Sequence, residues 1–214
     1  MIPLQTQPLT DTWIAAPWDE YLQLIDSPAY DKAKGYYYRG HMRIEMLPVG
    51  FDHATDHSII AFAINLFCVV KGIRLMMPDN CSYRKAGVQE CQPDLSCYTG
   101  DRAQVVPKTT NIVNLDRYPA PELVIEVAKT TLLDDLGTKR SLYEAIGVKE
   151  YWVVDVENAQ ILAYTVSDRG SERTETSLVL PGLAISLLED ALHRSRESDH
   201  STVGAWLLTQ FQST

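Results

Sequence analysis

The seven residues 122–128, with the sequence ELVIEVA, restrict the fold of this chain more than any other segment. Such a compact apolar run predicts a buried strand. Glu126 lies inside it, between Ile125 and Val127. A carboxylate in the middle of a buried strand is costly unless it is paired or binds a cation. The fold must therefore bring a positive group to Glu126.

A second carboxylate stands at the start of another predicted strand, residues 93–98. Asp94 follows Pro93 there, 32 residues before Glu126. Mg²⁺ prefers oxygen ligands and often takes one or two protein carboxylates. If the two strands are neighbours, Asp94 and Glu126 form a candidate magnesium site. Glu45, near the end of a predicted strand over residues 43–47, is a candidate third ligand, although a solvent-facing position is nearly as plausible for it.

Lys139 supplies a positive charge from a helix predicted over residues 134–146. It follows Asp135 by one turn and precedes Tyr143 by one turn. A lysine beside a metal-bound water can stabilise charge that develops on a phosphate. Two plainer interpretations stay open. Lys139 could pair with Asp135 on an exposed helix face, or it could neutralise Glu126 in a core salt bridge.

Apolar periodicity and turn residues place the other elements. A helix is expected over residues 18–25, a hairpin over 36–47 and a long core helix over 52–71, ended by Gly72. Further strands are expected at 73–76, 82–84, 150–156, 161–165 and 177–180, and further helices at 186–196 and 203–211. Helices and strands mix without regular alternation, which predicts a single α+β or mixed α/β domain over residues 1–214.

The charge balance limits the partners. The chain has 214 residues with 28 Asp and Glu against 19 Lys and Arg, a formal net charge of −9. Proteins that coat nucleic acid usually present a basic surface, so the net charge argues against tight nonspecific coating of nucleic acid. Residues 31–108 carry a slight positive excess and are the expected region for contact with a polyanion.

The N-terminal residues, the longest apolar stretch and the cysteines indicate where in the cell the protein is expected. The first residues have no basic and apolar pattern of a secretory signal, and the apolar stretch 59–70 is too short to span a bilayer. The four cysteines show no C-x-x-C spacing. A cytoplasmic protein with reduced thiols and no membrane partner is therefore expected.

Four ordered motifs stand out along the chain: RIEMLPVGFDH (43–53), QPDLS (92–96), PELVIEVAKTTLLDDLGTKRSLYEAIGVKEYWVVD (121–155) and LPGLAISL (180–187). Together they resemble the motifs of the PD-(D/E)xK nuclease superfamily. They are similar to those of a bacterial family of restriction-endonuclease-like proteins, abundant in cyanobacteria and long labelled a domain of unknown function. The resemblance covers roughly residues 18–190.

This resemblance implies a core of αβββαβ type, with a central mixed sheet flanked by helices and an extra N-terminal hairpin. Residues 1–17 would be an N-terminal extension and 197–214 a helical tail. The implied Mg²⁺ or Mn²⁺ ligands are Asp94, Glu126, the backbone carbonyl of Val127 and Glu45.

The superfamily lysine two places after the glutamate is Ala128 here. Lys129 would face the opposite side of the strand, so Lys139 corresponds to a lysine displaced to the following helix. His53 matches a histidine of the family, and its role stays open. The role of Tyr143 also stays open.

The function implied is that of a metal-dependent endonuclease acting on DNA. Two alternatives stay open: a weak or inactive member that binds nucleic acid or protein, and a structural homo-oligomer whose Asp94 and Glu126 are neutralised by Lys or Arg. A symmetric dimer is the commonest assembly, and it is the assembly expected here.

His53 and His57, at i and i+4, are more plausible as helix-start residues than as zinc ligands. The aromatic and basic residues 36–43 could face DNA, but packing in a core or dimer interface is the more plausible role for them.

Overall fold

Two mixed six-stranded sheets form the framework in the computed structural model, which describes residues 10–46 and 50–213. The first sheet has the strand order β1 (Ile14–Ala15), β3 (His41–Met46), β2 (Ala33–Tyr38), β6 (Gln89–Cys91), β5 (Ser82–Lys85) and β8 (Ile112–Asn114). The second has the order β12 (Gly170–Arg173), β11 (Gln160–Ser167), β10 (Glu150–Asp155), β9 (Leu123–Ala128), β7 (Leu95–Thr99) and β4 (Leu75–Met76).

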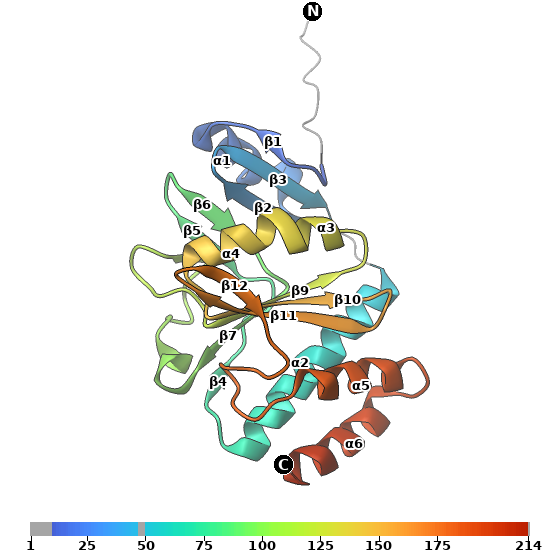
Figure 1. The fold of residues 1–214 in the computed structure, drawn as a ribbon. Helices are drawn as coiled ribbons and strands as arrows, with labels where there is room; N and C mark the ends of the chain where they lie inside the picture. The colour runs from blue at the N-terminus through green and yellow to red at the C-terminus, as the bar shows by residue number, and fades with distance from the viewer. Residues whose placement is uncertain (1–9, 47–49, 214) are drawn as a thin grey trace, which may run out of the picture.

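The helices cover the second sheet on both faces (Figure 1). On one face lie α2 (Phe51–Lys71), α5 (Ile185–Ser195) and α6 (His200–Ser213), which share an apolar core with the strands beneath them. The other face packs against α4 (Arg140–Ile146) and the first sheet. The helix α1 (Trp18–Ile25) closes the far side of the first sheet. This arrangement confirms the expected mixed sheet flanked by helices.

The long helix α2 is apolar because it is a core element. By length and composition alone it would be long enough to cross a membrane. Its buried residues pack under the second sheet and against α5 and α6; they include Ile59, Ile60, Ala63, Ile64 and Phe67. A core helix needs this composition, and α2 ends at Gly72, which adopts the left-handed conformation (φ 65°) that favours glycine. The absence of a membrane partner stays a prediction.

The centre of the second sheet holds the strands that carry the candidate site. Strand β9 pairs in parallel with β10 and antiparallel with β7, with Leu95 opposite Ile125. All six residues of β9 are buried. Because Asp94 directly precedes β7, this register places it beside the end of β9 that carries Glu126.

Several expected elements were correct in kind. The helix over 18–25, the hairpin, the long helix, and the central strands lie where the sequence predicted them, within a few residues. Strands β1, β6, β8 and β12 were not predicted. Leu47, assigned to the hairpin, lies outside the described residues, and the division into one domain with an N-terminal extension and a C-terminal tail stays a prediction.

The strand expected at 177–180 is absent from the part of the chain that the structure describes, and the expectation was wrong. The Glu150 carboxylate explains this difference. It accepts hydrogen bonds from the Ser177 hydroxyl at 2.6 Å and from the backbone amides of Leu178 and Val179 at 2.6 and 3.2 Å. These donors turn toward one carboxylate and cannot also pair with a neighbouring strand.

The helix expected over 134–146 is interrupted. A short turn, α3 (Leu132–Asp134), leads into a π-helical segment, Asp135–Lys139, and only then into α4. Widened turns of this kind frequently occur at functional sites. Here the widened turn buries both Asp135 and Lys139.

Candidate functional site

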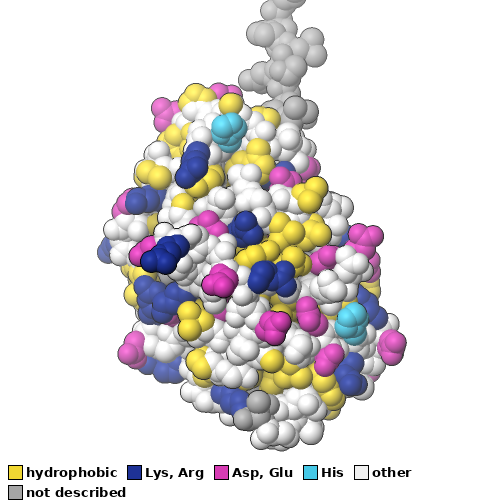
Figure 2. Space-filling view, in the orientation of Figure 1, with side chains coloured by type: hydrophobic (Ala, Val, Ile, Leu, Met, Phe, Trp, Pro, Cys, Tyr) yellow, Lys and Arg dark blue, Asp and Glu magenta, His cyan; other side chains and the backbone are white. Residues whose placement is uncertain are grey.

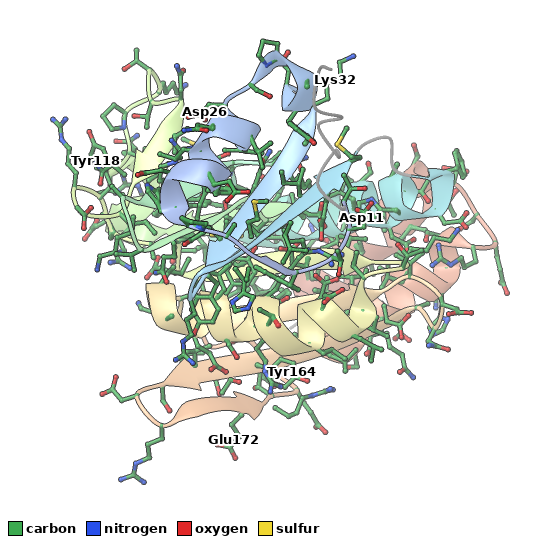
Figure 3. All side chains as sticks on the ribbon, turned by 90° about the horizontal axis from the view of Figure 1, so that it is seen from above. Asp11, Asp26, Lys32, Tyr118, Tyr164 and Glu172 are labelled. Carbon is green, nitrogen blue, oxygen red and sulfur yellow. The ribbon has the colours of Figure 1, made fainter. Side chains whose placement is uncertain are left out.

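The predicted site residues line one cavity of about 270 Å³. It opens between the end of β9, the β2–β3 hairpin and the first turns of α2. Its predicted lining residues are Asp94, Glu126, Val127, Glu45, Lys139 and His53. Asp11 also lines it and lies beside the start of α2 in the view from above (Figure 3). Sequence positions from 45 to 139 therefore converge on one site.

Asp94 is held in the ionised state at the wall of the cavity. One carboxylate oxygen accepts a hydrogen bond from the backbone amide of Val127 at 2.7 Å, and the other is paired with the ammonium of Lys34. The Nε2 atom of His53 lies 3.6 Å from Asp94. Burial by itself would raise the pKa of Asp94, but His53 and Lys34 hold it well below its ordinary value.

Glu126 has the opposite tendency, toward the protonated form. It is almost fully buried, and burial raises its pKa to about 8, against the opposing charge of Lys139. The hydroxyl of Tyr143 donates a hydrogen bond to Glu126 Oε1 at 2.5 Å, and the hydroxyl of Tyr36 lies 3.3 Å from the same oxygen. Two phenols and a distant ammonium, 3.9 Å away, therefore surround this carboxyl group.

Lys139 is enclosed by acidic groups. Its ammonium lies 2.9 Å from Glu45 Oε1 and 2.9 Å from Asp135 Oδ1, and it sits over the ring of Tyr36. Its side chain is only 2% exposed. Burial alone would lower the pKa of Lys139, but the charges of Glu126, Asp135 and Glu45 raise it. The pair with Asp135 exists, as one alternative held, but in the interior and not on an exposed helix face.

Glu45 is not solvent-facing. It accepts a hydrogen bond from Arg43 Nε at 2.7 Å in addition to its contact with Lys139. Burial would raise its pKa, but the charges of Lys139 and Arg43 lower it.

Core packing, the more plausible of the two roles weighed for the aromatic and basic residues 36–43, is confirmed for most of them, and a DNA-facing role is not. Tyr36, Tyr37, Tyr38 and Arg43 are buried. Tyr36 packs toward α4 and the second sheet, whereas Tyr37 packs under α1. These aromatic residues are core, because successive residues of a strand face opposite sides and both faces of this strand are covered.

Lys34 is the site residue that the sequence analysis missed. It precedes the aromatic residues of β2, lies directly opposite Glu45 in the hairpin, and reaches Asp94 across 60 positions of sequence. Nothing in the local pattern marks a lysine of an otherwise apolar strand as inward-facing. The only indication was that the predicted site had more carboxylates than lysines, so that a further positive group was needed there.

The donors present fit a hard divalent cation. Asp94 and Glu126 supply carboxylate oxygens. The carbonyl of Val127 lies on the same strand edge as its amide, which already bonds Asp94. Among the described residues, no three His, Cys, Asp or Glu side chains are arranged as a ready metal site. One or two carboxylates with a carbonyl and waters nevertheless match the preference of Mg²⁺.

Comparison with known proteins decides the family. A family model, Uma2, described as "Putative restriction endonuclease", matches residues 18–212. The chain belongs to the Uma2 family. A search of curated proteins found no match.

A solved structure supports the nuclease-like fold of this Uma2 chain. It is a "putative nuclease belonging to DUF820" from Anabaena variabilis ATCC 29413, with a TM-score of 0.57 and 18% sequence identity. The match covers 82% of this chain and 98% of the other. At this identity the likeness concerns the fold, which agrees with the restriction-endonuclease-like core expected from the sequence.

Proposed function

We propose that this Uma2 chain is a nuclease that hydrolyses phosphodiester bonds of DNA with Mg²⁺ or Mn²⁺. The observation that carries the proposal is the convergence of Asp94, Glu126 and Val127 with lysine side chains in one cavity. Family membership supports a nuclease, and DNA is the substrate that a restriction endonuclease would cut.

Each residue has a chemical role in this proposal. Asp94, Glu126 and the carbonyl of Val127 would hold the cation, which supplies positive charge beside the phosphate and lowers the pKa of water. Arg43 and Lys139 keep Glu45 in place. Tyr36 and Tyr143 orient Glu126 through their hydroxyl groups.

The molecular surface favours local contacts with DNA. Basic and acidic side chains are interspersed on the face shown in Figure 2, with no continuous basic area. With a net charge of −9, broad electrostatic attraction to a polyanion is absent. Binding through the cavity, with the cation bound, is the arrangement that suits such a surface.

Cleavage assays with the full chain test the proposal. Asp94→Asn and Glu126→Gln should each lower the rate with Mn²⁺ by at least about 100-fold, because each removes a charged ligand. Glu122→Gln is the matched control: Glu122 is a buried carboxylate before the other end of β9, paired with Lys149. Activity that survives both site substitutions, on supercoiled, linear or single-stranded DNA, contradicts the assignment.

One observation favours a second candidate, the structural homo-oligomer whose Asp94 and Glu126 are neutralised by basic residues. Lys34 is paired with Asp94, and Lys139 lies near Glu126, so both carboxylates have basic partners without any metal. A chain that neither binds Mn²⁺ nor cleaves DNA or RNA would select this candidate, whereas Mn²⁺ binding without cleavage would select a weak or inactive member that binds nucleic acid or protein. A homodimer with two such sites is part of the main proposal, and sedimentation of the full chain tests it.

A further inference from the structure

The two lysines of the cavity differ in how their donors are used. An ammonium group has three N–H donors and no acceptor. Lys139 directs its ammonium at Glu45 and Asp135, each 2.9 Å away, and its remaining sides face Glu126 and the ring of Tyr36. Three carboxylates and one aromatic ring therefore surround this ammonium, which also lines the first cavity.

Lys34 has a different environment. Among the described residues its only ion-pair partner is Asp94, and its side chain is 8% exposed, against 2% for Lys139. Two of its three donors are therefore uncommitted to a carboxylate. Strand pairing fixes its backbone, because β2 lies between β3 and β6 in the first sheet.

The position of Lys34 also places it between two cavities. The first contains the candidate metal ligands. The second, of about 250 Å³, lies on the side of His57, Asp79 and Asn80. Lys34, His53 and Asp94 line both cavities, so this group forms their common wall. A phosphodiester has substituents on both sides of its phosphorus, and two adjoining cavities can accommodate them.

We infer that Lys34, and not Lys139, is the catalytic lysine that contacts the scissile phosphate. Its ammonium stabilises the negative charge that develops on the phosphate oxygens as the new P–O bond forms and the leaving oxygen departs. Lys139 is a positioning residue that holds Glu45, Asp135 and Glu126 together. This inference rests on the proposed function. It assigns to Lys34 the stabilisation of phosphate charge that the sequence had predicted for Lys139.

A comparison of Lys34→Met with wild type tests the inference. At saturating Mn²⁺ the variant should lose about 100- to 1000-fold in kcat, the range typical for removal of one group that stabilises transition-state charge. KM should rise less, by about tenfold, because the ammonium also contacts the phosphate of the bound substrate before the reaction. Its Mn²⁺ affinity, measured by calorimetry, should stay equal or increase, because an ammonium no longer competes for Asp94. Lys149→Met, which removes one positive charge at the other end of β9, is the matched control.

If Lys34 has only a structural role, the kinetic and Mn²⁺-binding results differ from those expected above. Loss of Mn²⁺ affinity in Lys34→Met, or a kcat within threefold of wild type, overturns the inference. Lys34→Arg keeps the charge and the pairing with Asp94, so it should recover part of kcat. This variant keeps the test decisive if Lys34→Met folds poorly.

Failure of the proposed function can be separated from failure of this inference. If the wild-type chain cleaves no substrate, the proposed function fails. Binding of a short DNA oligonucleotide to the Ca²⁺-loaded chain, followed by fluorescence anisotropy, still examines Lys34. The Kd should rise at least about tenfold in Lys34→Met and stay unchanged in Lys149→Met. An equal Kd in Lys34→Met and wild type overturns the inference.

Discussion

Glu126 and Asp94 show how two carboxyl groups of one cavity acquire opposite protonation tendencies. Asp94 faces an ammonium, an imidazole and a backbone amide, all of which favour its charged form. Glu126 faces mainly phenolic hydroxyls in a fully buried position, where loss of solvent favours its neutral form. A cation that binds both groups would therefore have to displace a proton from Glu126 at neutral pH.

This difference predicts how the stability of the metal-free chain depends on pH. The pKa of Glu126 is about 8 in the folded chain, against an ordinary value of 4.5. The folded state thus holds this proton more tightly, so the stabilisation is complete below about pH 4.5 and is lost as the pH rises through about 8. Thermal unfolding with a chelator present should show a Tm that falls over this range.

Glu126→Gln isolates the contribution of this group. Its neutral amide has no proton to lose, so the decline in Tm between pH 5 and 8.5 should be smaller than in wild type. Equal slopes for the two proteins would contradict the raised pKa. Saturating Mg²⁺ should also reduce the slope in wild type, since a bound cation stabilises the charged carboxylate.

Strand β2 shows how an element places a functional residue through close packing. Gly35 follows Lys34 and faces α1. A Cβ atom there would lie 2.7 Å from Ile25 Cγ1 and in contact with the hydroxyl of Tyr21. Only glycine lets α1 approach the strand so closely, and this contact supports the backbone that carries Lys34.

Gly35→Ala should therefore destabilise the fold by overpacking, by about 2 kcal/mol. For a chain of this length the Tm should fall by about 6 °C. Gly137→Ala is the matched control: nothing lies within 4 Å of its added Cβ, and it lies in the π-helical turn. The control should be neutral or slightly stabilising, because alanine is the better helix former. A similar loss of Tm in both variants would exclude the packing explanation.

Local sequence patterns correctly predicted the helices and strands whose apolar residues recur regularly on one face. They predicted only some of the residues of the site. Helix α1 and the central strands followed from apolar spacing, and Asp94 and Glu126 stood out as carboxylates in apolar strands. Lys34 and the widened turn at 135–139 were missed because each depends on partners distant in sequence. The wrong strand at 177–180 has the same cause, since Glu150, 27 residues earlier, captures its donors.

At the scale of the whole molecule, the site lies where separate layers meet. The first sheet supplies Lys34 and Glu45, the second supplies Asp94 and Glu126, and α2 supplies His53. Geometry within the cavity therefore depends on how firmly α2 is held. Arg196, which follows α5, forms two hydrogen bonds with the carboxylate of Asp56 on α2, at 2.5 and 2.6 Å, and one with the carbonyl of Val156 at 2.9 Å.

Arg196→Ala should destabilise the whole chain, because it leaves the fully buried carboxylate of Asp56 without its partner. Removing one member of a buried ion pair typically costs 3–5 kcal/mol. Arg196 is itself one-third exposed, so a loss of about 3 kcal/mol in urea unfolding is expected. Arg194→Ala is the matched control, since Arg194, near the same end of α5, contacts only the partly buried ring of Trp206 among the ring and ion-pair partners of the described residues. The loss of unfolding free energy in Arg194→Ala should stay below about 1 kcal/mol.

The Mn²⁺ affinity of Arg196→Ala should weaken along with its stability if the layers cooperate in forming the site. An unchanged affinity would show that α2 is positioned by the apolar core alone.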